Sequence, residues 1–324
     1  MRILELFSGI GGMHFALKES NVEGEIVAAI DINTTANLVY KHNFPDANVL
    51  NKNIQGLTGD FLKKLNVDTI LMSPPCQPFT RNGLKKDTKD ARSSAFLHLL
   101  NILPELDIEN ILIENVKGFE ESEMRKVLIE HLERSQYIYQ EFILSPHQFG
   151  IPNTRHRYYC LAKKLPRKFS FEVGPIEESI KLFNTSNQPS SISQFLENNV
   201  DVLLYLLPEK VLRKYPTILD ICFPHSERSC CFTKAYGKYI EGTGSVFTEK
   251  PEHEFHEVYK SIQLLDADSE EYVNQLKKLN LRFFTPIEIA HLMSFPRYFS
   301  FPEISNKQKY MLLGNSINVK VVAE

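Results

Sequence analysis

The feature that most constrains the fold is the N-terminal segment, residues 3–31, which combines two short apolar runs with a glycine-rich turn. The expected elements are a strand at 3–7, a tight turn at 8–12, a helix at 13–19, a strand at 25–30 and then Asp31. This order is the βαβ arrangement with which parallel sheets bind nucleotides at the carboxyl ends of their strands. The same alternation continues to about residue 168, so we predict an α/β fold.

The glycine turn distinguishes between two kinds of nucleotide site. A dinucleotide fold uses G-x-G-x-x-G, and Gly9 and Gly11 fit that pattern, but His14 stands where the third glycine belongs. No phosphate-binding lysine follows the turn. Asp31, at the end of the second strand, has two oxygens that suit the two hydroxyls of a ribose. The pattern therefore favours a nucleoside-containing ligand other than a dinucleotide.

Cys76 is the candidate nucleophile. The apolar run 69–72 predicts a buried strand, and Pro74 and Pro75 end it, because proline cannot continue a central ladder. Most lone cysteines are small buried hydrophobes. Cys76, however, follows the strand among turn residues, where open α/β sheets bind their ligands.

A second predicted strand, 108–113, ends at Glu114 and Asn115. If the two strands are neighbours, Glu114 lies beside Cys76, although a glutamate at a strand end is often only a turn residue. Residues 151–170 carry six basic side chains and no acid. Such runs are commonly solvated, but alternate residues of a strand face the same way, so Arg155 and Arg157 are expected to face one site.

The second half of the chain has a different character. From about 170 to about 280 the alternation fails, which predicts a smaller and irregular second domain. Its run 229–245 has aromatic, lysine and glycine residues that suit a surface for stacked bases, or alternatively a strand with a glycine turn. Adjacent Cys230 and Cys231 lack the spacing of zinc ligands, so no metal site is expected. Thr285, Pro286 and Glu288 predict a helix start. We expect domains at 1–168 and 169–283, and a returning segment at 284–324.

Composition restricts the class of protein. The chain has 324 residues, of which 43% are hydrophobic, and a formal net charge of -3. With no global basic field, a nucleic-acid partner must meet local patches, here 81–92 and 155–168, which we expect on either side of the cleft. Five cysteines, an odd number, favour a reducing intracellular compartment, cytoplasmic or nuclear. No apolar run is long enough to span a bilayer, so no membrane association is expected.

Five motifs occur in the order used by cytosine-5 methyltransferases: residues 7–12, Pro75-Cys76-Gln77, Glu114-Asn115-Val116, Arg155-x-Arg157 and Gly314-Asn315-Ser316. The runs 73–81, 114–120 and 230–234 resemble one branch, the eukaryotic tRNA (cytosine-5) methyltransferases. The resemblance covers the whole chain and implies a Rossmann-like sheet with a target-recognition domain. It also implies that S-adenosylmethionine is the cofactor, leaving as S-adenosylhomocysteine.

The resemblance also implies roles for single residues. Catalytic roles fall to Cys76, Glu114, Asn115, Arg155 and Arg157. Cofactor contacts fall to Phe7, Ser8, Gly9, Ile10, Gly11, Gly12, Asp31, Ile32, Asn53, Ile54, Pro75, Asn315 and Ser316. Asn53 departs from the wider family, which often has an acid near the adenine ring. Substrate contacts fall to Gln77, Arg81, Cys230, Phe232, Thr233 and Lys234.

The implied reaction follows from the residue types. Attack of the Cys76 thiolate on carbon 6 of cytosine activates carbon 5 for methylation, while a neutral Glu114 protonates ring nitrogen 3. Arg157 would hold the base oxygen. The branch implies a monomer acting on a tRNA anticodon loop, at position 38 of aspartate tRNA. The alternatives are a DNA (cytosine-5) methyltransferase and a non-catalytic nucleic-acid binder.

Overall fold

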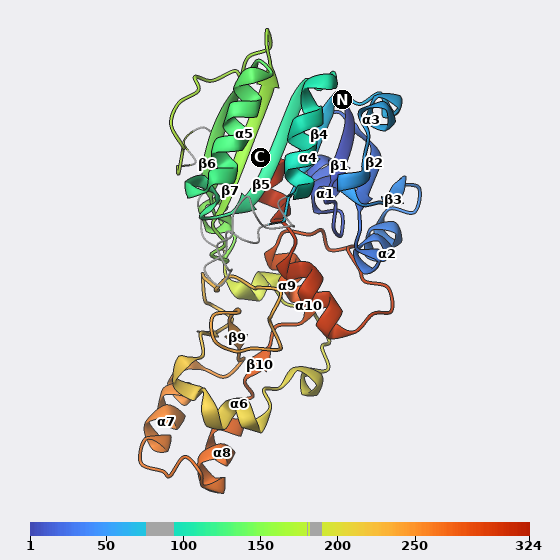
Figure 1. Ribbon diagram of the computed structural model, residues 1–324. Coiled ribbons are helices and arrows are strands. Elements are labelled where there is room, and N and C mark those ends of the chain that lie inside the picture. Colours follow the sequence, from blue (N-terminus) through green and yellow to red (C-terminus); the bar gives the residue numbers. More distant parts are fainter. Residues whose placement is uncertain (76–93, 180, 182–189) are drawn as a thin grey trace.

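A computed structural model describes residues 1–75, 94–179, 181 and 190–324, and its centre is a seven-stranded sheet (Figure 1). The strand order is β3-β2-β1-β4-β5-β7-β6. The strands are β1 Arg2–Leu6, β2 Glu25–Asp31, β3 Val49–Asn51, β4 Thr69–Met72, β5 Asn110–Val116, β6 Tyr137–Leu144 and β7 Arg157–Lys164. The first five are parallel to one another, and β7 runs antiparallel to both β5 and β6. The chain order reverses between β1 and β4, where such sheets bind ligands.

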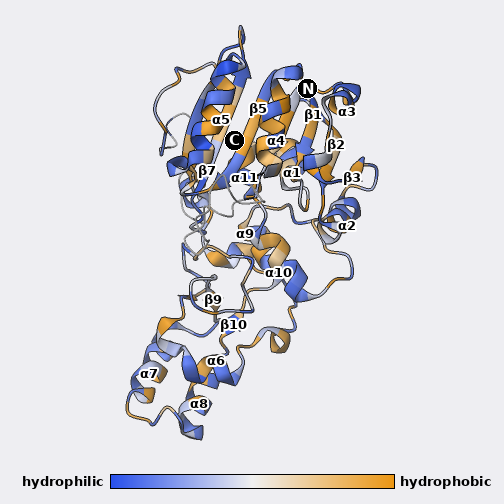
Figure 2. Cartoon of the chain, viewed as in Figure 1, coloured by the Kyte–Doolittle hydropathy of each residue, from blue (hydrophilic) through white to orange (hydrophobic). Residues whose placement is uncertain are grey.

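Helices cover the faces of this sheet: α1 Gly12–Glu19, α2 Thr34–Asn43, α3 Gly59–Leu65, α4 Ser94–Ile102 and α5 Glu123–Arg134. Figure 2 shows hydrophobic residues along the strands and on the helices beside them. Leu4, Leu6 and Ile30 are fully buried, as expected for strands covered on both faces. α5 begins directly after Ser122, because the Ser122 side chain accepts from the amide of Arg125 and caps the helix.

The second domain has more regular structure than its sequence predicted. A small sheet, in the order β10-β9-β8, joins β8 Ile221–Cys222, β9 Val246–Phe247 and β10 Arg282–Phe283. Below it in Figure 1 lie α6 Glu209–Lys214, α7 Glu252–Ile262 and α8 Glu270–Lys277. Short 3-10 helices complete the chain: η1 Ile54–Gly56, η3 Leu103–Glu105, η4 Phe119–Glu121, η5 Pro146–Phe149, η6 Ile192–Phe195, η7 Val202–Tyr205 and η8 Pro216–Ile218.

Three C-terminal helices link the two parts: α9 Pro286–Leu292, α10 Asn306–Gly314 and α11 Val319–Ala323. The predicted start of α9 is confirmed, since Thr285 and Glu288 form a capping box. α11 packs against α1 of the large domain. The division at 168 and 283 stays a proposal. In the part of the chain that the structure describes, no helix has the length and apolarity to cross a membrane.

Candidate active site

The site forms where β4 and β5 end side by side. These strands are parallel neighbours, with Met72 opposite Ile113, so Ser73 and Glu114 follow at the same edge of the sheet. Glu114 is 7% exposed, and its Oε1 lies 3.4 Å from Nε of Arg157 on β7. Burial raises the pKa of the Glu114 carboxyl, against the opposing charges of Arg157 and Arg155. A buried carboxyl with a raised pKa is suited to donate a proton.

Asn115 holds the residues that directly follow β4. This residue is 2% exposed, and its Nδ2 donates to the carbonyl oxygen of Pro74 at 3.4 Å. Its Oδ1 accepts from the amide of Val116 at 2.9 Å. Asn115 therefore ties the end of β5 to the chain two residues before Cys76. The candidate residues Cys76, Gln77 and Arg81 lie outside the described residues.

Arg155 and Arg157 converge on the sulfur of Cys231, as the alternation predicted, but their other partners differ. Arg155 is 3% exposed and links its own segment to two others. It donates to the carbonyl oxygen of Phe232 in one, and to those of Gly314 and Ser316 in the other. Arg157 lies beside Glu114 and reaches residues 229–245, here called the recognition run, through Cys231. Arg155 thus has the contacts of a residue that assembles the site, and Arg157 those of one that faces it.

Cys231 is the residue of this site that the sequence did not identify. Arg155 Nη1 lies 3.3 Å and Arg157 Nη2 3.8 Å from its sulfur. Burial alone would raise the pKa of the Cys231 thiol, but the two arginines outweigh it and lower that pKa. Cys230 was the expected contact, yet its sulfur lies 4.0 Å from Nη1 of Arg228, while its backbone amide donates to the Ser245 hydroxyl at 2.7 Å. Adjacent residues point in opposite directions in an extended chain, so only one of the two cysteines can face the arginines.

The other recognition residues divide into buried and exposed groups. Phe232 was expected to contact substrate, but its ring is 2% exposed and packs edge-on against Tyr236 and Phe284. Only its carbonyl oxygen reaches the site, through Arg155. Lys234 is exposed and Thr233 half-buried. The Phe232 ring is therefore part of the hydrophobic core beneath residues 233 and 234 and is not available to stack on a base.

Gly314 explains why a glycine opens the C-terminal motif. A Cβ there would lie 2.1 Å from the amide nitrogen of Lys234 and 2.3 Å from the carbonyl carbon of Thr233. Only glycine permits two backbones to approach so closely. The next residues of the motif, Asn315 and Ser316, follow the end of α10, and Ser316 contacts Arg155 through its carbonyl oxygen. The motif thus holds the recognition run against the catalytic domain.

The glycine turn between β1 and α1 has the backbone of a ligand site. Phe7 and Gly9 both have φ of 53°, and Gly11 has φ of 84°. A left-handed phenylalanine is strained, and such strain concentrates at functional sites. Ser8 is 6% exposed, and its Oγ is among the buried polar atoms without a partner in the described residues. The turn therefore leaves a polar group to be satisfied by a ligand.

Asp31 and its neighbours form the second wall of this ligand site. The Asp31 carboxylate accepts from the amides of Gly9, at 2.9 Å, and Asn33, at 2.8 Å, which places it directly beside the turn. Ile32 is 64% exposed, an apolar side chain left open for an adenine ring. The remaining expected cofactor residues are Ile10 and Gly12, buried at the start of α1, buried Ile54, and exposed Asn53 and Pro75. Nothing in this arrangement conflicts with a bound nucleoside.

The basic stretch lies only partly at the site. Because β7 is antiparallel to β5, Arg157 pairs with Val116 at the active-site edge, whereas Lys163 pairs with Asn110 at the opposite edge. Lys164 and Arg167 form ion pairs there with Asp107 and Glu109. The expectation that this stretch flanks the cleft is therefore wrong beyond Arg157, and Lys163, Lys164, Arg167 and the adjoining Lys168 belong to the far edge.

Comparison with known proteins agrees with this arrangement. Residues 1–324 match the family described as C-5 cytosine-specific DNA methylase. The tRNA (cytosine(38)-C(5))-methyltransferase of Spodoptera frugiperda is 51% identical, across 100% of this chain and 97% of that protein. The human protein of the same name is 44% identical, with the same coverage. The crystal structure of a Spodoptera frugiperda DNMT2 mutant covers 99% of this chain and 97% of its own, with a TM-score of 0.92 and 51% identity. This chain belongs to the C-5 cytosine-specific DNA methylase family and, within it, to the group of these relatives.

Proposed function

We propose that this protein transfers a methyl group from S-adenosylmethionine to carbon 5 of a cytosine in a tRNA anticodon loop, at position 38 of aspartate tRNA. The observation that carries the proposal is the buried pair of Glu114 on β5 and Arg157 on β7, 3.4 Å apart beside the end of β4, the strand that leads to Cys76. Full-length similarity to proteins named for methylation of tRNA cytosine 38 supports the choice of substrate.

The chain's own residues supply the activation of the base. Cys76, still a prediction, adds its thiolate to carbon 6 of cytosine, which raises the electron density at carbon 5. Glu114, kept neutral by burial, donates its proton to ring nitrogen 3 and neutralises the charge that this attack creates. Arg157 remains beside Glu114 to bind the base oxygen. Once carbon 5 has taken the methyl group, its proton is lost to solvent, the Cys76 thiolate is expelled from carbon 6, and the proton on ring nitrogen 3 returns to Glu114, which frees 5-methylcytosine. The base must leave its stack, which costs little in a single-stranded loop.

S-adenosylmethionine supplies an electrophilic methyl group when it is bound. The turn around Ser8 and Gly9 lies against the carboxylate of Asp31, and the unpaired Ser8 hydroxyl fits a polar ligand. Asp31 would hold the ribose, and exposed Ile32 would lie against the adenine. The positive end of α1 faces the same space, which suits the carboxylate of the methionine part.

The test compares substrates and variants in one assay. Purified protein with S-adenosylmethionine is incubated with total tRNA or duplex DNA, and 5-methylcytosine is mapped by bisulfite sequencing. We expect one methylated site, in a tRNA anticodon loop, and none with Cys76→Ala. Calorimetry should show that Cys76→Ala still binds S-adenosylhomocysteine and that Asp31→Ala binds it much more weakly.

The same assay can overturn the proposal. Faster methylation of DNA than of every tRNA would favour the DNA methyltransferase alternative. The matching family is described as a DNA methylase, which supports that alternative. Full activity of Cys76→Ala would remove the assigned nucleophile. Binding without any methylation would leave the non-catalytic alternative. We also propose that a single chain is the active unit in a reducing compartment, in keeping with free thiols at Cys160, Cys222, Cys230 and Cys231.

A further inference from the structure

Residues 233–243, here called the recognition loop, form a closed and internally bonded turn. The amide of Thr233 donates to the carbonyl oxygen of Thr243 at 2.9 Å, which closes the base of the loop. Inside it, the amide of Tyr239 donates to Ala235, and the Thr243 hydroxyl donates to the Tyr239 carbonyl oxygen at 2.7 Å. The backbone on both sides of Tyr239 is therefore held in place.

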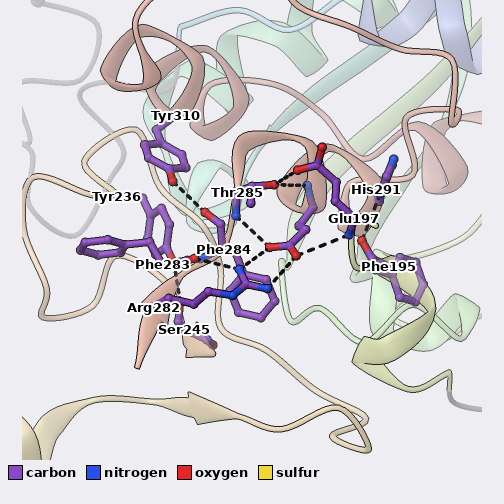
Figure 3. Close-up of polar contacts among 11 residues, drawn as sticks. Phe195, Glu197, Tyr236, Ser245, Arg282, Phe283, Phe284, Thr285, His291 and Tyr310 are labelled. Carbon is purple, nitrogen blue, oxygen red and sulfur yellow. Dashed lines mark hydrogen bonds and ion pairs between the residues drawn. The ribbon is translucent and has the colours of Figure 1, made fainter. Parts of the chain in front are cut away.

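The aromatic rings in and beside this loop differ in their exposure to solvent. Phe232 and Tyr236 are 2% and 4% exposed. The Tyr236 hydroxyl donates to the carbonyl oxygen of Ser245 and accepts from the amide of Phe284, as Figure 3 shows. Tyr239, in contrast, is 58% exposed. Two rings thus anchor the loop in the core, and the third is presented to solvent on a fixed backbone.

The charge around Tyr239 is mainly positive. Lys234 and Lys238 are exposed, and Nζ of Lys238 lies 5.0 Å from the centroid of the Tyr239 ring. Glu241 is the acid of the loop. An exposed aromatic ring among lysines is the arrangement with which proteins stack unpaired bases and bind their phosphates.

The recognition loop is also attached directly to the active site. Its first residues meet the C-terminal motif backbone to backbone, at Lys234 and Gly314. The preceding residues, Cys231 and Phe232, bind Arg155. A nucleic acid whose target base lies at Glu114 and Arg157 would extend from there along this loop.

We propose that Tyr239 stacks on an unpaired base of the substrate RNA, one that neighbours the target cytosine in the loop, while Lys234 and Lys238 bind the adjoining phosphates. This inference rests on the proposed function and adds a contact that selects a single-stranded loop over a duplex. The ring recognises an exposed base face, which a paired and stacked duplex does not offer.

The first experiment measures Tyr239→Ala and Tyr239→Phe by anisotropy with a labelled anticodon stem-loop and by single-turnover methylation. Tyr239→Ala should weaken RNA binding about 5- to 100-fold, the usual range for one lost stacking contact. Tyr239→Phe should bind nearly as the wild type, because it keeps the ring. The matched control is Tyr298→Ala, since Tyr298 is 65% exposed but lies beside Phe15 of α1. Affinity for S-adenosylhomocysteine should be unchanged in all three variants.

The second experiment identifies the base. Stem-loops with one abasic position each are tested against the wild type and Tyr239→Ala, and one abasic position should weaken wild-type binding but not the variant. Lys234→Ala with Lys238→Ala should reduce the slope of log affinity against log salt by about two. The control pair Lys163→Ala with Lys164→Ala, at the far edge of the sheet, should leave it unchanged.

Each result decides the inference. If the wild type methylates tRNA while Tyr239→Ala binds RNA equally well, the stacking contact is wrong and the proposed function stands. If Tyr298→Ala weakens binding as much, or if no abasic position couples to Tyr239, the contact is also overturned. If the wild type methylates no tRNA at all, the proposed function fails, and this inference fails with it.

Discussion

The buried ion pair between Arg282 and Glu288 offers a sharp test of what holds the second domain to the C-terminal helices. Figure 3 labels Arg282, which lies in β10, and Thr285, the N-cap of α9, on either side of the junction that the pair spans. The guanidinium donates to both carboxylate oxygens, at 2.7 and 2.8 Å, and the side chains are 4% and 0% exposed. The Glu288 carboxylate also accepts from the amide of Thr285, at 2.8 Å, within the capping box of α9.

Arg282→Met keeps an unbranched apolar stem but removes the guanidinium, which leaves the Glu288 carboxylate buried without its counter-charge. Breaking such a pair costs about 3–5 kcal/mol. At about 2 °C per kcal/mol for a large domain, the melting temperature should fall by about 6–10 °C. The double variant Arg282→Met with Glu288→Met should lie closer to the wild type, because an apolar pair in place of an ion pair is often neutral. It still loses the cap, at about 0.5–2 kcal/mol.

The assay is urea unfolding followed by circular dichroism, with scanning calorimetry for the melting temperature. Arg213→Met is the matched control, because Arg213 forms its ion pairs with Glu209 and Glu270 at the surface, where such pairs contribute about 0–1 kcal/mol. The reasoning is refuted if Arg282→Met loses no more stability than Arg213→Met, or if the double variant is less stable than the single one.

Three further predictions concern the buried Glu5 of β1 and two residues of the candidate active site, Gly314 and Glu114. Burial raises the pKa of Glu5 to about 8, against the hydrogen bond from Tyr40, so the folded state holds a proton that the unfolded chain releases. The free energy of unfolding should therefore decline between about pH 4.5 and 8, by up to about 1.4 kcal/mol per pH unit, and Glu5→Gln should remove that decline in urea titrations. Gly314→Ala places a Cβ against the recognition-loop backbone, so we expect about 1–3 kcal/mol less stability and a large loss of methylation, whereas unchanged kinetics would contradict the close packing. Glu114→Gln should lower kcat about 10²- to 10⁴-fold with S-adenosylhomocysteine affinity retained, and wild-type kcat should fall as pH rises through the raised pKa of Glu114.

Several parts of the structure could be predicted from short stretches of sequence. The turn around Gly9 and Gly11, the strand that carries Glu114 near its end and the helix start at Thr285 depend on neighbours a few residues away. Hydrophobic period, capping residues and glycine positions act over that range. One local signal was overlooked: Phe255, Val258, Tyr259 and Ile262 have the helical spacing of α7.

Other features were decided only when distant segments packed together. The sequence could not say that Cys231 and not Cys230 meets Arg155, 76 residues away, because the irregular chain around them has no period from which to read orientation. Nor could it place Lys163 at the far edge of the sheet, since that depends on β7 running antiparallel to β5.

The same limit applies to the aromatic residues of the recognition run. Phe232 and Tyr239 are both aromatic residues of the run 229–245, and the sequence does not distinguish their roles. The fold buries Phe232 against Phe284 and exposes Tyr239. By itself, then, the sequence determined the chemistry and the elements that carry it, because both depend on residue type and local spacing. Tertiary structure decided which side chains face the site, because that depends on contacts between segments far apart in the chain.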